Sequence, residues 1–365
     1  MMDLRCGDAL IELKKIPDES VDCCITSPPY WALRDYGVEG QLGLEPTFQE
    51  YITKLCDIFD EVKRVLKKEG TCWVNIGDTY FGGGNNKGSS PENLSDMQRG
   101  NRGAQGQVQQ DWSKMDYSDK CLCLISFRFA IEMVNRGWIL RNTIIWHKRN
   151  CMPSSVKDRF TVDFEYVFFM VKSKKYYFEQ QYVSAKQCSI ERLSRAVSNK
   201  NKWVKGADGQ TPHNLSQPRP NRNTKIPKEI AEKMGSPRVR YHRYKGGDNI
   251  GRENNCAIST YQFEEGDYLV SPFDPTKGRN MRCVWNITTK GYKGAHFAVF
   301  PEALVEPMIK AGCPQGGVIL DPFAGSFTTL VAAKKLRRQG IGIDLNPAYC
   351  EMGKKRLDNT QESMF

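Results

Sequence analysis

Two short strings at opposite ends of the chain constrain its fold more than any other feature. Residues 26–31 read Thr-Ser-Pro-Pro-Tyr-Trp, and residues 321–326 read Asp-Pro-Phe-Ala-Gly-Ser. Each string follows an apolar run, at 21–25 and at 317–320, with the composition of a buried strand. Ligand sites in open α/β sheets lie at the carboxyl ends of strands. The chain is therefore predicted to be an α/β protein with a site-forming turn after each of these strands.

Length and composition limit the class of protein. With 365 residues, 39% of them hydrophobic, the chain can form one large domain that carries a smaller insert. No run approaches the roughly 18 apolar residues that span a bilayer, and charges interrupt the N-terminus where a signal peptide is apolar. The thirteen cysteines form no Cys-x-x-Cys pair and the four histidines are scattered, so no metal site is predicted. These features predict a cytoplasmic protein without membrane contact.

The charge of the chain favours a polyanionic partner. The formal net charge is +11 and the pI is near 9.0. Basic residues concentrate at 200–205 and 238–245, where tryptophan and tyrosine alternate with lysine and arginine. Such segments can contact both phosphates and bases. A generic basic surface is the alternative, but the clustering favours nucleic acid.

Hydrophobic periodicity predicts the order of the elements. Residues 1–80 alternate between strand and helix, with Gly70 as a helix stop before a strand at 71–76. This alternation is typical of a parallel sheet. Two further apolar runs, 138–146 and 166–171, are predicted to form an antiparallel edge of the same sheet.

The changes in composition along the chain predict three parts. Residues 1–178 form the first part, within which the polar stretch 81–119 is interpreted as a mobile, substrate-gripping loop, with a linker as the alternative. Residues 179–285 are basic and punctuated by proline and glycine, as expected of an inserted domain. Residues 286–365 return to the strand-turn-helix pattern of the first part.

The later string is interpreted as a cofactor site. A strand ending in Asp321, a turn containing Gly325, a helix and a second strand ending in Asp344 match the way doubly wound folds bind adenosine. Asp344 is predicted to accept hydrogen bonds from ribose hydroxyls, and Asp321 to face a cationic end of the ligand. Ser326 and Phe327 stand where a dinucleotide site requires glycine, which disfavours NAD. A capped strand-turn-helix without a ligand is the alternative.

The early string is interpreted as an amine site. The lone pair of an exocyclic base amine is delocalised into the ring, so a catalyst must hold the amine hydrogens and aim the nitrogen. The Ser27 hydroxyl and the Pro28 carbonyl are predicted acceptors, and Pro28 and Pro29 stiffen the turn. Tyr30 offers a face for a flipped base, with Trp31 a weaker candidate. A proline-rich turn that only closes the strand is the alternative.

Methylation at carbon 5 of cytosine would require an attacking cysteine, and proline stands at the corresponding position of this turn. Cys23 and Cys24 precede the turn within the apolar run. They are predicted to pack in the core.

These motifs together resemble the S-adenosylmethionine-dependent DNA amino-methyltransferases. The family's cofactor motif, Asp-Pro-Phe-x-Gly-Ser-Gly-Thr-Thr, is matched over 321–329 except that Phe327 replaces its last glycine. Residues 296–304 resemble the segment that wraps the methionine moiety. The order of amine motif, basic insert and cofactor motif resembles the β group of the family.

The resemblance implies a Rossmann-like mixed sheet in circular order, with the catalytic half before the cofactor half, and a target-recognition domain inserted between them. It implies S-adenosylmethionine as cofactor and Ser27, Pro28, Pro29 and Tyr30 as catalytic residues. The cofactor-binding residues that it implies are Asp8, His296, Phe297, Ala298, Asp321, Phe323, Gly325, Ser326, Thr328 and Asp344. For Asp8, a helix cap before residues 10–15 is an equal alternative.

The implied substrate is duplex DNA, with one base flipped out of the helix. Ser-Pro-Pro-Tyr accompanies N4 of cytosine more often than N6 of adenine in the family, so cytosine is favoured and adenine is the alternative. RNA and protein glutamine are weaker candidates as acceptors. A ring at Phe327 near the cofactor also motivates a non-catalytic partner subunit with a degenerate pocket. A cognate restriction enzyme is a candidate partner, and a monomer and a homodimer both remain open.

Overall fold

The computed structural model describes residues 1–82, 115–184, 279–289 and 300–361. The chain divides into two compact units. The first unit joins Met1–Gln181 to Arg282–Phe365, and the second comprises Tyr182–Met281. Within the described ranges, no helix is long and apolar enough to cross a membrane.

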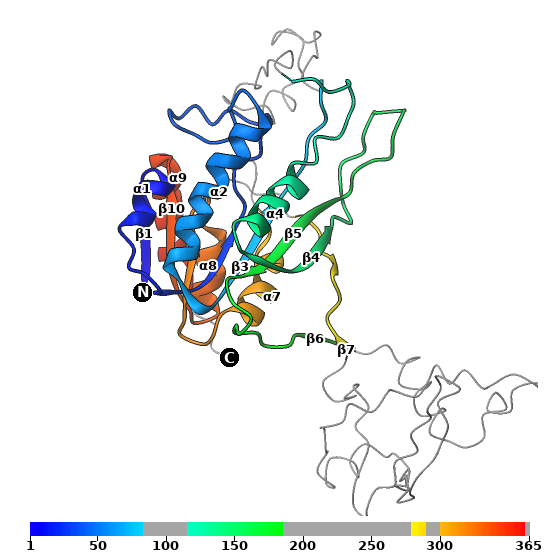
Figure 1. Cartoon of the computed structure of the whole chain (residues 1–365). Helices are drawn as coiled ribbons and strands as arrows, with labels where there is room; N and C mark the ends of the chain where they lie inside the picture. The colour runs from blue at the N-terminus through cyan, green and yellow to red at the C-terminus, as the bar shows by residue number, and fades with distance from the viewer. Residues whose placement is uncertain (83–114, 185–278, 290–299, 362–365) are drawn as a thin grey trace, which may run out of the picture. The chain divides into compact units, whose positions relative to one another are not determined.

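The first unit is built on one mixed sheet of eight strands in the order β1-β10-β9-β2-β3-β5-β4-β8 (Figure 1). The neighbours from β1 to β3 are parallel, whereas β5 runs antiparallel to both β3 and β4. The strands are β1 Met2–Cys6, β2 Val21–Thr26, β3 Leu66–Ile76, β4 Ile139–His147, β5 Phe164–Val171, β8 Val284–Asn286, β9 Val318–Asp321 and β10 Gln339–Asp344.

Helices pack against one another in two groups. The first group consists of α1 (Ala9–Lys14), α2 (Phe48–Val65) and α4 (Ile125–Asn135), with α2 in contact with the other two. The second group, α7 (Glu302–Gly312), α8 (Thr328–Lys335) and α9 (Pro347–Asp358), is centred on α8. Together with the sheet they give the α/β architecture predicted from the sequence.

Helix α2 illustrates how local sequence sets an element's limits. Thr47 caps its start, because the Thr47 hydroxyl accepts a hydrogen bond from the Glu50 backbone N–H at 3.2 Å. The prediction that Gly70 ends this helix was wrong, since α2 ends at Val65 and Gly70 lies inside β3. A Cβ on Gly70 would lie 3.2 Å from the Asp22 carbonyl oxygen, so glycine here permits the close approach of β2 at a register shift.

The predicted antiparallel pair is confirmed as β4 and β5. Residues 167–171 of β5 are all buried, as expected of a strand that has neighbours on both sides. β5 is therefore internal, and the short β8, paired parallel to β4, forms the edge.

The second unit is described only where it begins and ends. Tyr182–Val183 (β6) and Arg279–Asn280 (β7) pair antiparallel. The basic segments 200–205 and 238–245, and most of the loop predicted at 81–119, lie outside the described residues.

Candidate active site at the junction of β9 and β2

The two predicted turns follow strands that are neighbours in the sheet. β9 and β2 are parallel, with Cys23 opposite Ile319 and Cys24 opposite Leu320. From β2 the chain continues to β3 on one side, and from β9 it continues to β10 on the other. Such a reversal of strand order leaves a crevice at the carboxyl ends of the strands, where doubly wound folds bind ligands.

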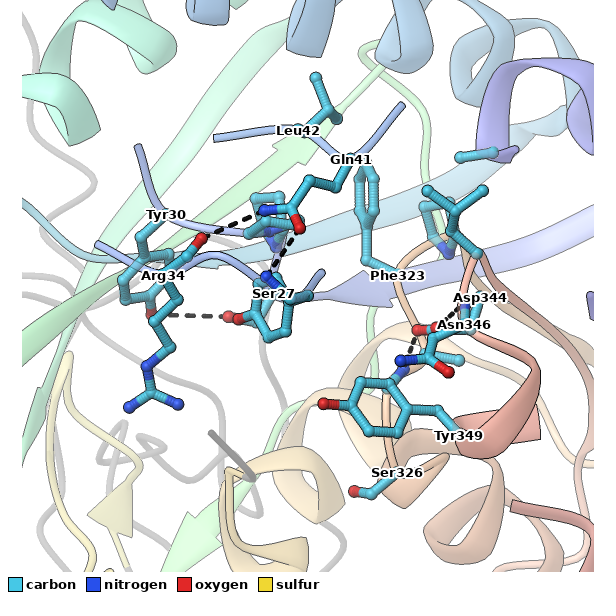
Figure 2. A pocket seen from close by; sticks show the side chains of 18 of the residues that line it. Ser27, Tyr30, Arg34, Gln41, Leu42, Phe323, Ser326, Asp344, Asn346 and Tyr349 are labelled. Atoms are coloured by element: carbon cyan, nitrogen blue, oxygen red, sulfur yellow. Dashed lines mark hydrogen bonds between the residues drawn. The ribbon is translucent and has the colours of Figure 1, made fainter. Parts of the chain in front are cut away.

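A cavity of about 310 Å³ opens at this junction, a volume within the range of small-molecule sites. Figure 2 shows Asp344, Asn346 and Tyr349 on one side of it and Ser27 and Tyr30 on the other. The structure brings ten of the sequence-predicted site residues to its wall: Asp8, Ser27, Pro28, Pro29, Tyr30, Phe323, Gly325, Ser326, Thr328 and Asp344.

Asp344 ends β10 at the cavity wall. One carboxylate oxygen accepts a hydrogen bond from the Gly325 backbone N–H at 2.7 Å, and the other accepts one from the Asn346 N–H at 2.9 Å. Burial raises the pKa of this carboxyl, while the two backbone donors act in the opposite direction. Each oxygen retains a second lone pair, so the fixed carboxylate can still accept from a pair of ligand hydroxyls.

Asp321 does not line the cavity, contrary to the prediction that it faces the ligand. Its side chain is buried and accepts hydrogen bonds from the Thr26 and Thr329 hydroxyls, both at 2.6 Å. Burial raises the pKa of the Asp321 carboxyl to about 6, although these hydrogen bonds favour the charged form. Through these hydrogen bonds Asp321 connects β9 to the end of β2 and to α8. It therefore stabilises the turn that follows β9 without lining the cavity.

The Phe327 ring also lies away from the cavity. Phe327 adopts a left-handed conformation with φ of 61°, and its ring is buried in a cluster with Ala324, Leu330 and Leu357. A Cβ on Gly353 would lie 2.2 Å from this ring, and a Cβ on Gly342 would lie 2.8 Å from it. Chain glycines therefore make room for the ring between α9 and β10. The expectation that the ring intrudes on the cofactor was wrong.

The end of the cavity at the Ser27 turn is rigidly held. The Tyr51 hydroxyl donates a hydrogen bond to the Pro29 carbonyl at 2.8 Å. The Tyr30 ring lies against the backbone at Gly77, where a Cβ would approach Cε2 to 2.5 Å. Ser27 Oγ lies 3.4 Å from the Tyr30 hydroxyl. The Pro28 carbonyl accepts no hydrogen bond from the part of the chain that is described, so it is a ready acceptor.

Trp31 is not a stacking surface. Its side chain is 1% exposed, and the indole N–H donates to the Glu45 carbonyl at 2.9 Å. The predicted core positions of Cys23 and Cys24 are confirmed, since both are fully buried. Burial raises the pKa of both thiols well above their ordinary value, so neither is a ready nucleophile.

Two predictions concern segments that flank this site. Asp8 is the N-cap of α1, with its carboxylate accepting from the Ile11 N–H at 3.0 Å, and it also lines the cavity. Both interpretations of Asp8 are therefore compatible with its position.

His296, Phe297 and Ala298 lie outside the described residues. No group of side chains suited to a metal ion occurs within the described ranges.

Sequence reasoning missed several residues that line the cavity. Gln41 lies on the segment after the Ser27 turn, where its side chain accepts from the Tyr36 N–H at 2.7 Å and donates to the Arg34 carbonyl at 3.2 Å (Figure 2). Tyr349 at the start of α9 and Glu165 on β5 were also missed. The position of Asn346, directly after the acid-ended strand and before α9, is a signal that could have indicated it. No pattern in the sequence indicates that Glu165 reaches this cavity.

The doubly wound sheet, the turn of Gly325 beside Asp344, and the Ser27 turn on the neighbouring strand β2 are the arrangement expected of a Rossmann-like enzyme. Comparisons with known proteins identify the family. A family model described as DNA methylase, for the N6/N4 group, matches residues 21–355.

Individual proteins agree with that family. The chain is 33% identical over 359 residues to type II methyltransferase M.Cfr9I of Citrobacter freundii, covering 98% of this chain and 88% of that protein. It is 44% identical over 364 residues to type II methyltransferase M.HpaI of Haemophilus parainfluenzae, covering 98% and 75%. The solved PvuII DNA methyltransferase, titled cytosine-N4-specific, shares the fold with a TM-score of 0.52 at 16% identity, over 97% of this chain and 85% of that one.

The chain belongs to the N6/N4 DNA methylase family, and it is an S-adenosylmethionine-dependent DNA amino-methyltransferase. The resemblance, the Rossmann-like fold and the cofactor predicted from the sequence are thereby confirmed.

Proposed function

We propose that the chain methylates N4 of cytosine in duplex DNA and serves as the modification enzyme of a type II restriction-modification system. The main support for this proposal is that one cavity is lined by both the Ser27-Pro28-Pro29-Tyr30 turn and the turn of Gly325 and Asp344. The serine at the first position of the amine turn favours cytosine. The type II methyltransferases to which the chain is similar support the biological role.

The cofactor end of the cavity fits S-adenosylmethionine. Asp344 presents a half-buried carboxylate beside the Gly325 backbone, and Phe323 and Tyr349 supply aromatic surface. The Phe327 ring packs away from the cavity. The ring therefore gives no reason to favour a non-catalytic subunit with a degenerate cofactor pocket. When bound, the cofactor supplies an electrophilic methyl group on a sulfonium. Asp344 then holds the ribose, and Asp8 and Phe323 border the adenosine.

The amine end positions the nucleophile. The Ser27 hydroxyl and the Pro28 carbonyl accept hydrogen bonds from the two amine hydrogens, and the Tyr30 ring stacks on the flipped base. With both hydrogens held, the nitrogen lone pair would be directed along the line to the methyl group, and the one amine proton released on methyl transfer would pass to solvent. The turn therefore acts by orientation and electrostatics, since none of its groups is a strong base.

DNA is held by elements beyond this cavity. We infer that the basic insert at 179–285 is the target-recognition domain and that the stretch 81–119 grips the duplex. The net charge of +11 and the aromatic residues within the basic segments support this assignment.

The test is to incubate the purified chain with unmodified plasmid DNA and S-adenosylmethionine, digest the DNA to nucleosides, and identify the products by mass spectrometry. N4-methylcytosine is expected. N6-methyladenine instead would overturn the choice of base, and no methylated nucleoside from a range of DNAs would count against the function itself.

A further inference from the structure

A partly buried ion pair lines the same cavity as the Ser27 turn. Glu165 at the start of β5 pairs with Lys148, which follows β4, and their side chains are only 18% and 22% exposed. Both residues line the cavity beside Tyr30. The cavity gains a positive and a negative group there, close to where a flipped base would lie. Neither is used in the chemistry assigned above.

Glu165 connects the residues that shape this end. One of its carboxylate oxygens accepts from the Tyr30 hydroxyl at 2.8 Å and from Asn75 Nδ2 at 3.1 Å. Asn75 also donates to the Tyr166 carbonyl at 3.1 Å, which fixes its amide. Burial, and secondly the charge of Glu165, raise the pKa of Tyr30 well above its ordinary value, so the phenol remains a donor. The orientation of the Tyr30 ring is thus set by Gly77 from one side and by Glu165 from its hydroxyl.

Lys148 is held so that it retains donors for a ligand. Its ammonium group pairs with the second oxygen of Glu165 and lies 4.8 Å from the centroid of the Trp146 ring. An ammonium has three N–H donors, and the pair with Glu165 uses one. A base that enters with its amine toward Ser27 carries ring acceptors on the same Watson–Crick edge. In cytosine these acceptors are N3 and the carbonyl oxygen O2. Adenine has the equivalent of N3, its N1, but a C–H in place of O2, so a donor to O2 favours cytosine.

We propose that the Glu165–Lys148 pair positions the target base: Glu165 fixes the stacking ring of Tyr30, and Lys148 donates a hydrogen bond to the carbonyl oxygen O2 of a flipped cytosine. Lys148 is then a specificity-determining residue and Glu165 a positioning residue. The inference rests on the proposed function. It adds recognition of the ring to the recognition of the amine by Ser27 and Pro28.

The first experiment measures methyl transfer to unmodified plasmid DNA together with S-adenosylmethionine affinity by calorimetry. Lys148→Met and Glu165→Gln are each expected to lower kcat/KM about 10- to 100-fold, the effect of losing one hydrogen bond to a charged group. Cofactor affinity is expected to stay at the wild-type value, and the circular dichroism spectrum is expected to show that both variants keep the wild-type fold. Lys148→Arg keeps the cation and is expected to recover part of the loss. Lys120→Met is the matched control, because its partner Asp158 is exposed and away from the cavity.

The second measurement is the ratio of N4-methylcytosine to N6-methyladenine among the products. The wild type is expected to yield N4-methylcytosine. Lys148→Met is expected to lower this ratio by yielding some N6-methyladenine beside less N4-methylcytosine, whereas a purely structural change would lower N4-methylcytosine without adding the second product. Wild-type kcat/KM in both variants, or an equal loss of cofactor affinity and turnover, would overturn the inference. If the wild-type chain itself methylates no DNA, the failure lies with the proposed function instead.

Discussion

The packing of Phe327 against Gly353 predicts a strong energetic coupling between these two positions. A Cβ on Gly353 would lie 2.2 Å from the Phe327 ring, closer than carbon atoms can approach. Gly353→Ala must therefore displace the ring, at the upper end of the roughly 1–3 kcal/mol that overpacking costs. Alanine regains up to about 1 kcal/mol over glycine inside helix α9. We expect a net loss of about 2 kcal/mol in the free energy of unfolding.

The same substitution should reverse its sign when the ring is absent. Phe327→Ala alone is expected to cost about 3–5 kcal/mol, because the ring is fully buried. In that background the space beside Gly353 is open, so Gly353→Ala should stabilise the chain by up to about 1 kcal/mol through helix propensity. The coupling energy is then about 3 kcal/mol, at the top of the range for residues in contact.

Urea unfolding of the wild type, the two single variants and the double variant measures this coupling. Gly312→Ala serves as the control, because its Cβ would meet Thr71 and Trp73 rather than Phe327. Its effect should be the same in both backgrounds. A coupling below about 0.5 kcal/mol between Phe327 and Gly353, the level of independent sites, would refute the placement of the ring.

Three further predictions concern the site. Ser27→Ala should lower kcat about 10- to 100-fold with little change in DNA affinity, since the hydroxyl acts on the reacting amine. Turnover assays and filter binding to DNA measure the two effects. Equal losses of kcat and DNA affinity would argue against this role of Ser27. Asp344→Asn should weaken S-adenosylmethionine binding about 10- to 100-fold by calorimetry, because it removes a charged acceptor of hydroxyls, and an unchanged Kd would place the ribose elsewhere. Asp321 has a pKa raised from 3.8 to about 6, so it binds a proton more tightly in the folded than in the unfolded chain. Its contribution to stability is then fully present below about pH 4 and falls by on the order of 3 kcal/mol as the pH rises to about 6. Asp321→Asn should remove that decline, and a parallel pH profile for both proteins would contradict it.

The sequence predicted the strands and turns of the site well, because apolar runs that end in Ser-Pro-Pro or Asp-Pro-Phe leave few other folds. Strands β4 and β5 were also predictable from continuous apolar runs. The direction in which a side chain points could not be predicted from the sequence. Asp321 and Asp344 both end parallel strands, yet only Asp344 faces the cavity. The buried threonine partners of Asp321 come from β2 and α8, and spacing along the chain does not indicate such contacts.

Contacts across the sheet account for the other differences. Glu165 approaches Tyr30 because β5 lies between β3 and β4, and Lys148 and Glu165 come together across an antiparallel pair. A pattern of single residues holds no information on that register. Phe327 was misjudged because the space for its ring is made by Gly342 and Gly353, which lie well beyond it in the sequence.

One cavity at the junction of β9 and β2 is proposed to hold both the cofactor and the amine. The most direct measurement is a crystal structure of the chain with S-adenosylhomocysteine. We expect the ribose hydroxyls within hydrogen-bond distance of Asp344 and the sulfur directed toward Ser27. Ligand density away from Asp344, or a sulfur that points away from the Ser27 turn, would contradict it.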